Sequence, residues 1–439
     1  MASRTDRKHR HRDDHEAHPS GNDQRPPARR DRDRILYCSA FRRLSGITQV
    51  VAPTEHYPTH NRLTHTLKVA QVGRSLAENL LVNPKNREIA VCAGGLDPEV
   101  VESAALAHDL GHPPFGHITE RELDAIVTEH GIPDGYEGNA QSFRIVTKLA
   151  VRYPDVEGLD VTRATLNAIL KYPWTRAGDG PKSRRWGAYR SEVDDLRWAR
   201  QGCPLGDDVP SLEAALMDWA DDVTYAVHDV EDFFRAGLIP LDRIVTDRSE
   251  RDRVLQAVSV RPRDDDSLSI DDLARVFNTL MDSAPMAMPF QGSRADRATI
   301  RSYTSGLIDR YVTAISLTDP AGNGSPLRID PIARMEVWML KALTWYYVIE
   351  SRSLVAQRFG QRRLIRALFD ILLDASSKEE DWHVFPTIYQ ELLAESSDDA
   401  DRVRLVADLI ASMSEAHVVT MYHRLTGLAA GSVMDPVLP

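Results

Sequence analysis

The ten residues from His108 to His117 constrain the chain more than any other segment. Their sequence, HDLGHPPFGH, follows an apolar helical repeat, and the two adjacent prolines cannot continue that helix. Gly111 suits the C-terminal cap of the helix that ends here. The turn therefore places three imidazoles and one carboxylate at a helix end, where they can offer nitrogen and oxygen ligands to a divalent cation.

Long stretches of the chain carry the apolar spacing of packed helices. Apolar residues recur every three or four positions over Arg62–Leu81, Glu99–Asp109 and Leu212–Phe234, which is the period of a helix with one buried face. The pattern weakens after residue 252 and returns over 331–356 and 361–425. The fold class is therefore predicted to be all-α.

A strand pair is predicted only at Ala314–Ile329. Apolar runs lie there on both sides of the sequence DPAGNG, which occupies residues 319–324. Proline, glycine and asparagine at that density are typical of a hairpin or a long turn. We expect one small β-hairpin in an otherwise helical chain.

Residues 1–34 are predicted to form a disordered, charged tail. They are rich in arginine and acidic residues, include four histidines and contain almost no apolar side chain. Such a composition cannot bury enough surface to fold. We expect order to begin near Ile35.

The remaining composition fits a large helical protein of the cytoplasm. The chain has 439 residues, of which 42% are hydrophobic, but no apolar run long enough to cross a membrane. No apolar secretion signal is visible near its charged N-terminus. The three cysteines are widely spaced and predict neither a disulfide framework nor a zinc ribbon. The net charge of −11 disfavours a broad nucleic-acid-binding surface but allows a local basic pocket.

Three predicted helices each offer ligands for one metal ion. His65 lies near the start of the first helix, His108 and Asp109 end the second, and the pair Asp221-Asp222 lies in the third. Two imidazoles and two carboxylates suit an octahedral Mn²⁺, Mg²⁺, Fe²⁺, Ni²⁺ or Co²⁺ ion that keeps open positions. A lone histidine or a lone His-Asp pair is a weak signal, whereas the set together is much stronger.

Helical spacing bears on which aspartate completes the set. Asp221, Tyr225 and Asp229 follow one another at intervals of four residues and share one helix face, whereas Asp222 points about 100° away. We choose Asp221 as the ligand, although the spacing alone leaves Asp222 open.

The motifs together resemble those of the deoxyguanosine triphosphate triphosphohydrolase (dGTPase) family within the HD-domain superfamily. They run in the family's order over roughly residues 30–235, and the C-terminal half adds only weak similarity. Besides HDLGHPPFGH and Tyr225 with Asp229, they are RDRDRIL (30–36), SAFRRL (39–44), TQV (48–50), NRLTHTL (61–67), EGNAQ (137–141), KYP (171–173) and ADD (220–222).

The resemblance implies an architecture as well as an activity. Residues 35–240 would form an HD-domain helical bundle that is the catalytic core. Residues 241–439 would form a mostly helical region that completes the fold and provides an oligomer interface. The implied reaction is metal-dependent hydrolysis of dGTP, or of dNTPs more broadly, to the deoxynucleoside and inorganic triphosphate.

The family's catalytic His-Glu pair falls on His117 and Glu120. Breaking the bond to the 5′ oxygen leaves an alkoxide, so a proton donor is needed nearby. The sequence does not decide whether His117 donates that proton or prepares the attacking water.

The resemblance also implies how substrate is held. Gln49 and Asp229 would bind the sugar hydroxyl, and Tyr225 would pack against the deoxyribose and exclude a 2′-hydroxyl. Arg62 would grip the phosphates, and His112 would contact the triphosphate. Further cations for the phosphates are expected from a basic set, namely Lys171, Lys182, Arg184 and Arg185.

The family resemblance also implies partners, and two alternative functions stay open. Members of this family are expected to be homo-oligomers, tetramers or hexamers, with a nucleotide or single-stranded DNA as a possible effector and no membrane. The base preference and the native metal stay open. The alternatives are an HD phosphohydrolase that acts on another nucleotide phosphoester and a non-catalytic nucleotide-sensing regulator.

Overall fold

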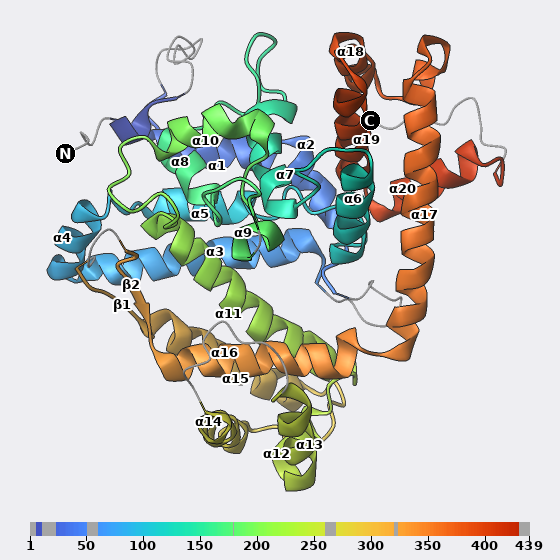
Figure 1. Ribbon diagram of the computed structural model, residues 1–439. Coiled ribbons are helices and arrows are strands. Elements are labelled where there is room, and N and C mark those ends of the chain that lie inside the picture. The colour runs from blue at the N-terminus through green and yellow to red at the C-terminus, as the bar shows by residue number, and fades with distance from the viewer. Residues whose placement is uncertain are drawn as a thin grey trace.

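Helices make up almost all of the regular structure in a computed structural model of the chain (Figure 1). The structure describes residues 6–10, 23–50, 60–178, 180–259, 269–319 and 324–429. Within these residues the sheet consists of two short strands. The all-α prediction is confirmed.

Three helices form the centre of the fold. They are α3 (Arg62–Val82), α5 (Pro98–Ala107) and α11 (Leu212–Arg235), and α3 packs against both of the others. A side chain at Gly73 of α3 would lie 3.1 Å from Val101, so glycine permits this close approach. The helices predicted from apolar spacing in this half are confirmed, with ends that differ by one or two residues.

Further helices surround these three in the first half of the chain. They are α1 (Pro27–Tyr37), α2 (Ser39–Arg43), α4 (Pro84–Cys92), α6 (His117–Glu129), α7 (Gly138–Arg144), α8 (Arg163–Ile169), α9 (Pro181–Arg184) and α10 (Val193–Arg200).

The second half contributes further helices below and beside the centre (Figure 1). They are α12 (Leu241–Thr246), α13 (Arg248–Val258), α14 (Ile270–Asp282), α15 (Arg294–Thr313), α16 (Pro331–Thr344), α17 (Arg352–Ser376), α18 (Thr387–Glu395), α19 (Asp399–Ser412) and α20 (Glu415–Leu425).

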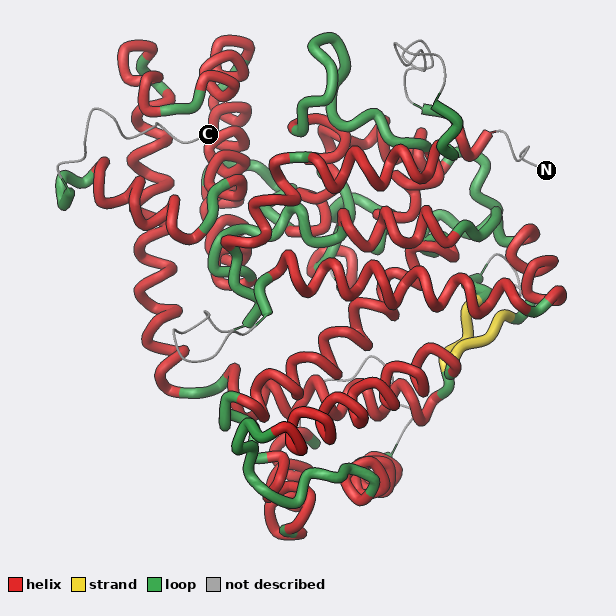
Figure 2. The backbone as a smooth tube through the Cα atoms, turned by 180° about the vertical axis from the view of Figure 1, so that it is seen from behind, coloured by secondary structure: helices red, strands yellow, loops and turns green. Residues whose placement is uncertain are grey.

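The predicted hairpin is confirmed. Strands β1 (Ile315–Leu317) and β2 (Leu327–Ile329) pair antiparallel, and β1 contacts α3 and α4 (yellow in Figure 2). Residues 320–323, which belong to the predicted turn, lie outside the described residues.

The buried apolar side chains form two main clusters. The larger one runs from α1 to α16 without a break at the predicted boundary of residue 240. The second joins α6 to α17, α19 and α20.

The break between the two long helical stretches predicted for the second half lies at another position than expected. The sequence predicted a break near Gly360, but α17 runs through this glycine, and the chain turns at Glu350–Ser351 instead. None of the described helices is both long enough and apolar enough to span a membrane.

The prediction of a disordered tail up to residue 34 is wrong for Pro27–Arg34, which is helical. Charged side chains of this segment form ion pairs and hydrogen bonds within the fold, although the composition predicted a disordered tail. Asp31 is fully buried and accepts hydrogen bonds from Thr162 N (2.9 Å), Thr165 Oγ1 (2.8 Å) and Arg10 Nη1 (2.7 Å). Arg10, which also lies in the predicted tail, is itself buried.

This network makes Asp31 a sensitive position for stability. Replacing Asp31 with Ala leaves the Arg10 guanidinium buried without its carboxylate, so we expect the free energy of unfolding to fall by about 3–5 kcal/mol. Asp33→Ala removes an acid of the same helix from more exposed ion pairs and should cost less than about 1 kcal/mol. Urea denaturation followed by circular dichroism measures both, and equal losses would contradict the role assigned to the network.

Candidate active site

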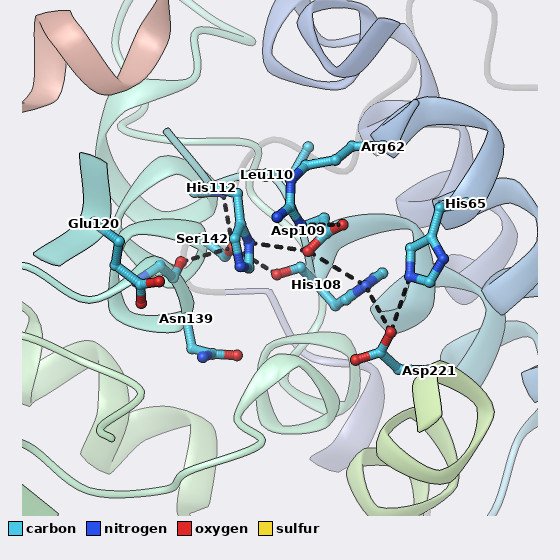
Figure 3. Close-up of polar contacts among 12 residues, drawn as sticks. Arg62, His65, His108, Asp109, Leu110, His112, Glu120, Asn139, Ser142 and Asp221 are labelled. Atoms are coloured by element: carbon cyan, nitrogen blue, oxygen red, sulfur yellow. Dashed lines mark hydrogen bonds and ion pairs between the residues drawn. The ribbon is translucent and has the colours of Figure 1, made fainter. Parts of the chain in front are cut away.

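Side chains from α3, α11 and the turn after α5 meet in one buried cluster (Figure 3). One ligand atom from each of His65, His108 and Asp109 lies within 4.8 Å of the others. Asp221 of α11 faces them, with Oδ1 2.9 Å from His65 Nε2 and 3.7 Å from His108 Nε2. The four residues predicted as metal ligands are therefore brought together.

The ring of His108 is oriented as a metal ligand needs. Its Nδ1 donates a hydrogen bond to the carbonyl oxygen of Ala105 (2.6 Å), which leaves Nε2 to point into the cluster. That Nε2 atom is buried and has no hydrogen-bond partner among the described residues. Because an unpartnered buried nitrogen is costly, and because two imidazoles and two carboxylates suit divalent ions, the residues fit such a cation.

The two adjacent aspartates, Asp221 and Asp222, have different partners in the structure. Asp222 forms an ion pair with Lys341 of α16 (2.6 Å) and turns away from the histidines. Burial would raise the pKa of Asp221, but the hydrogen bond from His65 and the positive charges nearby hold it well below its usual range. Asp221 therefore offers an ionised carboxylate oxygen as a possible metal ligand beside the two imidazoles.

The turn that carries His108 and Asp109 is pressed against the start of α7. A side chain at Gly111 would lie 2.3 Å from both Gly138 O and Ser142 N, so only glycine fits. The expectation that Gly111 caps α5 is wrong, since α5 ends at Ala107. Ser142 fastens the turn, because its Oγ accepts from Gly111 N (2.9 Å) and donates to His108 O (2.8 Å).

Arg43 supports the same turn from the other side. Its half-buried guanidinium donates to the carbonyl oxygens of Leu110 (2.6 Å) and His112 (2.9 Å). Burial lowers the pKa of Arg43 to about 10. Arg43 belongs to the SAFRRL motif, but no role was predicted for it, because carbonyl partners leave no signal in sequence.

Asp109 links the metal-ligand cluster to two further groups. Its Oδ2 accepts from Arg62 Nη1 (2.9 Å), and its Oδ1 lies 2.9 Å from His112 Nδ1. Burial first, and Arg62 next, lower the pKa of His112 to about 4, so this imidazole is neutral at pH 7. His112 also packs edge-on against His117, with ring centroids 5.5 Å apart.

His117 and Glu120 form a hydrogen-bonded pair at the start of α6. A left-handed backbone at Phe115 (φ 62°) and Gly116 (φ 58°) turns the chain into this helix. His117 Nδ1 lies 2.5 Å from Glu120 Oε2, and the His117 side chain is 54% exposed. The imidazole therefore has one nitrogen fixed by a buried acid while its edge is open to a ligand.

His112, His117 and Glu120 also satisfy the spacing of a second metal cluster. Two guanidinium groups argue against a second cation there. Arg185 Nη1 donates to Glu120 Oε1 (2.9 Å), and Arg62 reaches the neighbouring turn at Gly116. The surroundings favour an anion instead.

The face of α11 that carries Asp221 continues through Tyr225 to Asp229. Asp229 is buried, and its Oδ2 has no hydrogen-bond partner among the described residues. Burial, with Asp232 and Asp221 nearby, raises its pKa well above the usual range. Gln49 Oε1 is likewise buried and unpartnered in the described part of the chain. It lies just before residues 51–59, which are not described.

The predicted basic set is only partly at the site. Lys171 lies 3.9 Å from Asp221 Oδ2 and pairs with Asp218. Arg185 contacts Glu120, as described above. The two others lie elsewhere: Lys182 pairs with Asp208 (2.6 Å), and Arg184 forms no ion pair within the described ranges.

Glu415, at the start of α20, is a site-supporting residue that the sequence analysis missed. Its Oε1 accepts from Thr48 N (2.9 Å) and Phe115 N (3.2 Å), and its Oε2 accepts from Thr48 Oγ1 (2.8 Å). It thereby joins the residue before Gln49 to the turn before His117. Its sequence separation of 300 or more residues gave no local signal.

Comparison with known proteins agrees with this geometry. Residues 62–226 match the HD domain, and residues 327–424 match the phosphohydrolase-associated domain. Deoxyguanosinetriphosphate triphosphohydrolase-like proteins of Corynebacterium efficiens and Streptomyces coelicolor are 36% and 37% identical to the chain. They align over 91% of this chain and over 91% and 92% of their own lengths.

The chain belongs to the dGTPase-like family of HD-domain proteins. A member from Wolinella succinogenes is 32% identical over 92% of this chain and 96% of its own length. The predicted family is therefore confirmed, and the chain is an HD phosphohydrolase. The His-Asp cluster is the part of it that could hold a divalent metal.

The two adjacent aspartates give a matched test of the metal site. We expect Asp221→Asn to weaken Mn²⁺ binding at least about 100-fold, because it removes a charged ligand oxygen. Asp222→Asn should change the affinity less than about threefold, since its carboxylate faces Lys341. Isothermal titration of the metal-stripped protein measures both, and equal effects would contradict the assignment of Asp221.

Proposed function

We propose that the protein is a metal-dependent dNTP triphosphohydrolase that converts dGTP, or dNTPs more broadly, to the deoxynucleoside and inorganic triphosphate. One observation carries the proposal. The buried cluster of His65, His108 and Asp109 lies beside an exposed imidazole, His117, that is hydrogen-bonded to a buried acid. Such a layout suits hydrolysis of a phosphoester next to a metal site.

The four ligands would hold the metal from three sides of the site. His65 comes from α3, His108 and Asp109 from the turn after α5, and Asp221 from α11. The chemistry that a bound divalent cation supplies is charge neutralisation at the α-phosphate and a lowered pKa for water. Asp109 is shared with Arg62 and His112, so these two side chains lie where the phosphates would bind.

His117 is the group that we assign to proton transfer. Its Nδ1 is committed to Glu120, so Nε2 is the atom that exchanges a proton with the substrate or the water. Glu120 is buried, yet the hydrogen bond from His117 and the nearby positive charges hold its pKa well below the usual range. An ionised Glu120 stabilises the imidazolium form of His117.

The face of α11 would select the sugar. Asp229 offers a buried, unpartnered oxygen that could bind a 3′-hydroxyl. Tyr225 lies one turn closer to the metal ligands, where its ring would occupy the space of a 2′-hydroxyl. Gln49, whose buried Oε1 is an unpartnered acceptor, would bind the same sugar.

The expected partners are part of the same proposal. A homo-oligomer and a nucleotide or single-stranded DNA effector rest on the family resemblance. The base preference is left to experiment, since it depends on pocket shape. Hydrolysis of another nucleotide phosphoester, or nucleotide binding without turnover, would be alternative outcomes of the assay.

The activity is tested with a panel of the four dNTPs and added Mn²⁺. We expect release of inorganic triphosphate from at least one dNTP. We also expect His117→Gln to lower kcat about 10²- to 10⁴-fold without changing the bound metal, because this ring is not one of the four ligands. His130→Gln, on the far end of α6, is the matched control and should leave kcat unchanged. Absence of triphosphate release from every dNTP would contradict the proposal.

Tyr225 is tested through the choice between deoxyribose and ribose. We expect Tyr225→Ala to narrow the ratio of kcat/KM between a dNTP and its ribonucleotide about 10-fold or more, because the space for a 2′-hydroxyl opens. Parallel assays of both nucleotides measure the ratio. If both activities fall by the same factor, the ring does not select the sugar.

A further inference from the structure

The EGNAQ motif contributes a buried carboxylate whose role is not explained by metal or substrate binding. Glu137 is 2% exposed and caps the N-terminus of α7. Its Oε2 accepts from the backbone nitrogens of Asn139 (2.5 Å) and Ala140 (3.1 Å). Glutamate is an unusual residue at this capping position, where Ser, Thr, Asp and Asn are preferred. Capping of α7 alone therefore does not explain why a glutamate occupies this position.

The other oxygen of Glu137 faces Glu120. One guanidinium nitrogen, Arg185 Nη1, donates to Glu137 Oε1 (3.1 Å) and to Glu120 Oε1 (2.9 Å). The same Glu120 oxygen accepts from Gly138 N (3.2 Å), the amide that follows Glu137. Two buried carboxylates are thus bridged by one cation, and only Glu120 Oε2 is left for His117 Nδ1 (2.5 Å).

The surroundings of Glu137 contain few other charges. The titratable groups that face it are Glu120 of α6, together with Arg185, Tyr172 and Tyr189 of the segment between α8 and α10. Burial, and then Glu120, raise the pKa of Glu137 to about 7, against the opposing charge of Arg185. The charge on Glu137 therefore changes near neutral pH while Glu120 stays ionised.

We propose that Glu137 and Arg185 are positioning residues that hold Glu120 against His117 and set the charge that the His117 imidazole experiences. The inference rests on the assignment of His117 to proton transfer in the proposed function. Neither residue needs to touch the reacting atoms. Glu137 acts through Arg185, and Arg185 acts through Glu120.

Two substitutions should move His117 in opposite directions. Glu137→Gln keeps an acceptor oxygen for the α7 cap but removes a negative charge, so the imidazolium form is disfavoured and His117 should lose its proton at lower pH. Arg185→Gln removes a positive charge, so His117 should lose its proton at higher pH. We expect each midpoint to move by roughly 0.5 to 1 on the pH scale. Structural damage alone would not give opposite signs.

The readout needs no substrate. Protein with ¹³C-labelled histidine is titrated by NMR, and His117→Gln identifies the His117 ring signal. Glu192→Gln is the matched control, because Glu192 is also fully buried and paired with an arginine, Arg144 (2.6 Å), but lies outside the site. Glu137→Asp, which keeps the charge, should restore most of the wild-type titration.

Activity supplies a separate measurement. In Glu137→Gln the inflection in log kcat against pH should move with the NMR midpoint. KM should change less than about twofold, because Glu137 is buried and is linked to Glu120 through Arg185. An unchanged midpoint in Glu137→Gln, or a shift that Glu192→Gln reproduces, would overturn the inference. A protein that hydrolyses no dNTP would overturn the proposed function but leave the NMR result standing.

Discussion

The close packing of the turn after α5 against the start of α7 is the constraint on which the site depends. At Gly111 the two backbones approach so closely that no side chain fits between them. This contact fixes His108 and Asp109 through Ser142. It also fixes Gly138, whose amide holds Glu120. One backbone contact therefore sets the metal-ligand cluster and the His117-Glu120 pair relative to each other.

The buried acids of the site differ in charge because their neighbours differ. Asp109 lies among Arg62, His108 and His112, and these positive or polar neighbours outweigh its burial and hold its pKa well below the usual range. Asp229 lies on the same helix as Asp221, but its burial, with Asp232 and Asp221 nearby and no cation close enough to outweigh them, raises its pKa. Carboxylates in contrasting environments take contrasting roles. An ionised acid suits a metal ligand, whereas a neutral one suits a hydrogen bond to a sugar hydroxyl.

The sequence predicted those parts of the fold and site that are encoded locally. Apolar spacing predicted the helices that carry His65 and Asp221, and the two prolines predicted the turn after Asp109. Charge composition gave a wrong prediction at Asp31, because a count of charged residues does not reveal that they pair with one another in the interior. The partners of Arg43 could not be predicted from the sequence either, because they are carbonyl oxygens that only the fold brings close.

Lys341 and Glu415 of the C-terminal half support the site, and both lie in the region that matches the phosphohydrolase-associated domain. Lys341 pairs with Asp222 and lies 5.8 Å from the ring centre of Tyr225, so α16 supports the face of α11 that would bind the sugar. Glu415 fixes the backbone beside Gln49 and the turn before His117. The HD domain supplies His117 and the residues that could hold a metal, but the backbone beside Gln49 and that turn are held from α20. The two matched regions therefore build one site, and an HD domain cut off after residue 226 would lack these supports.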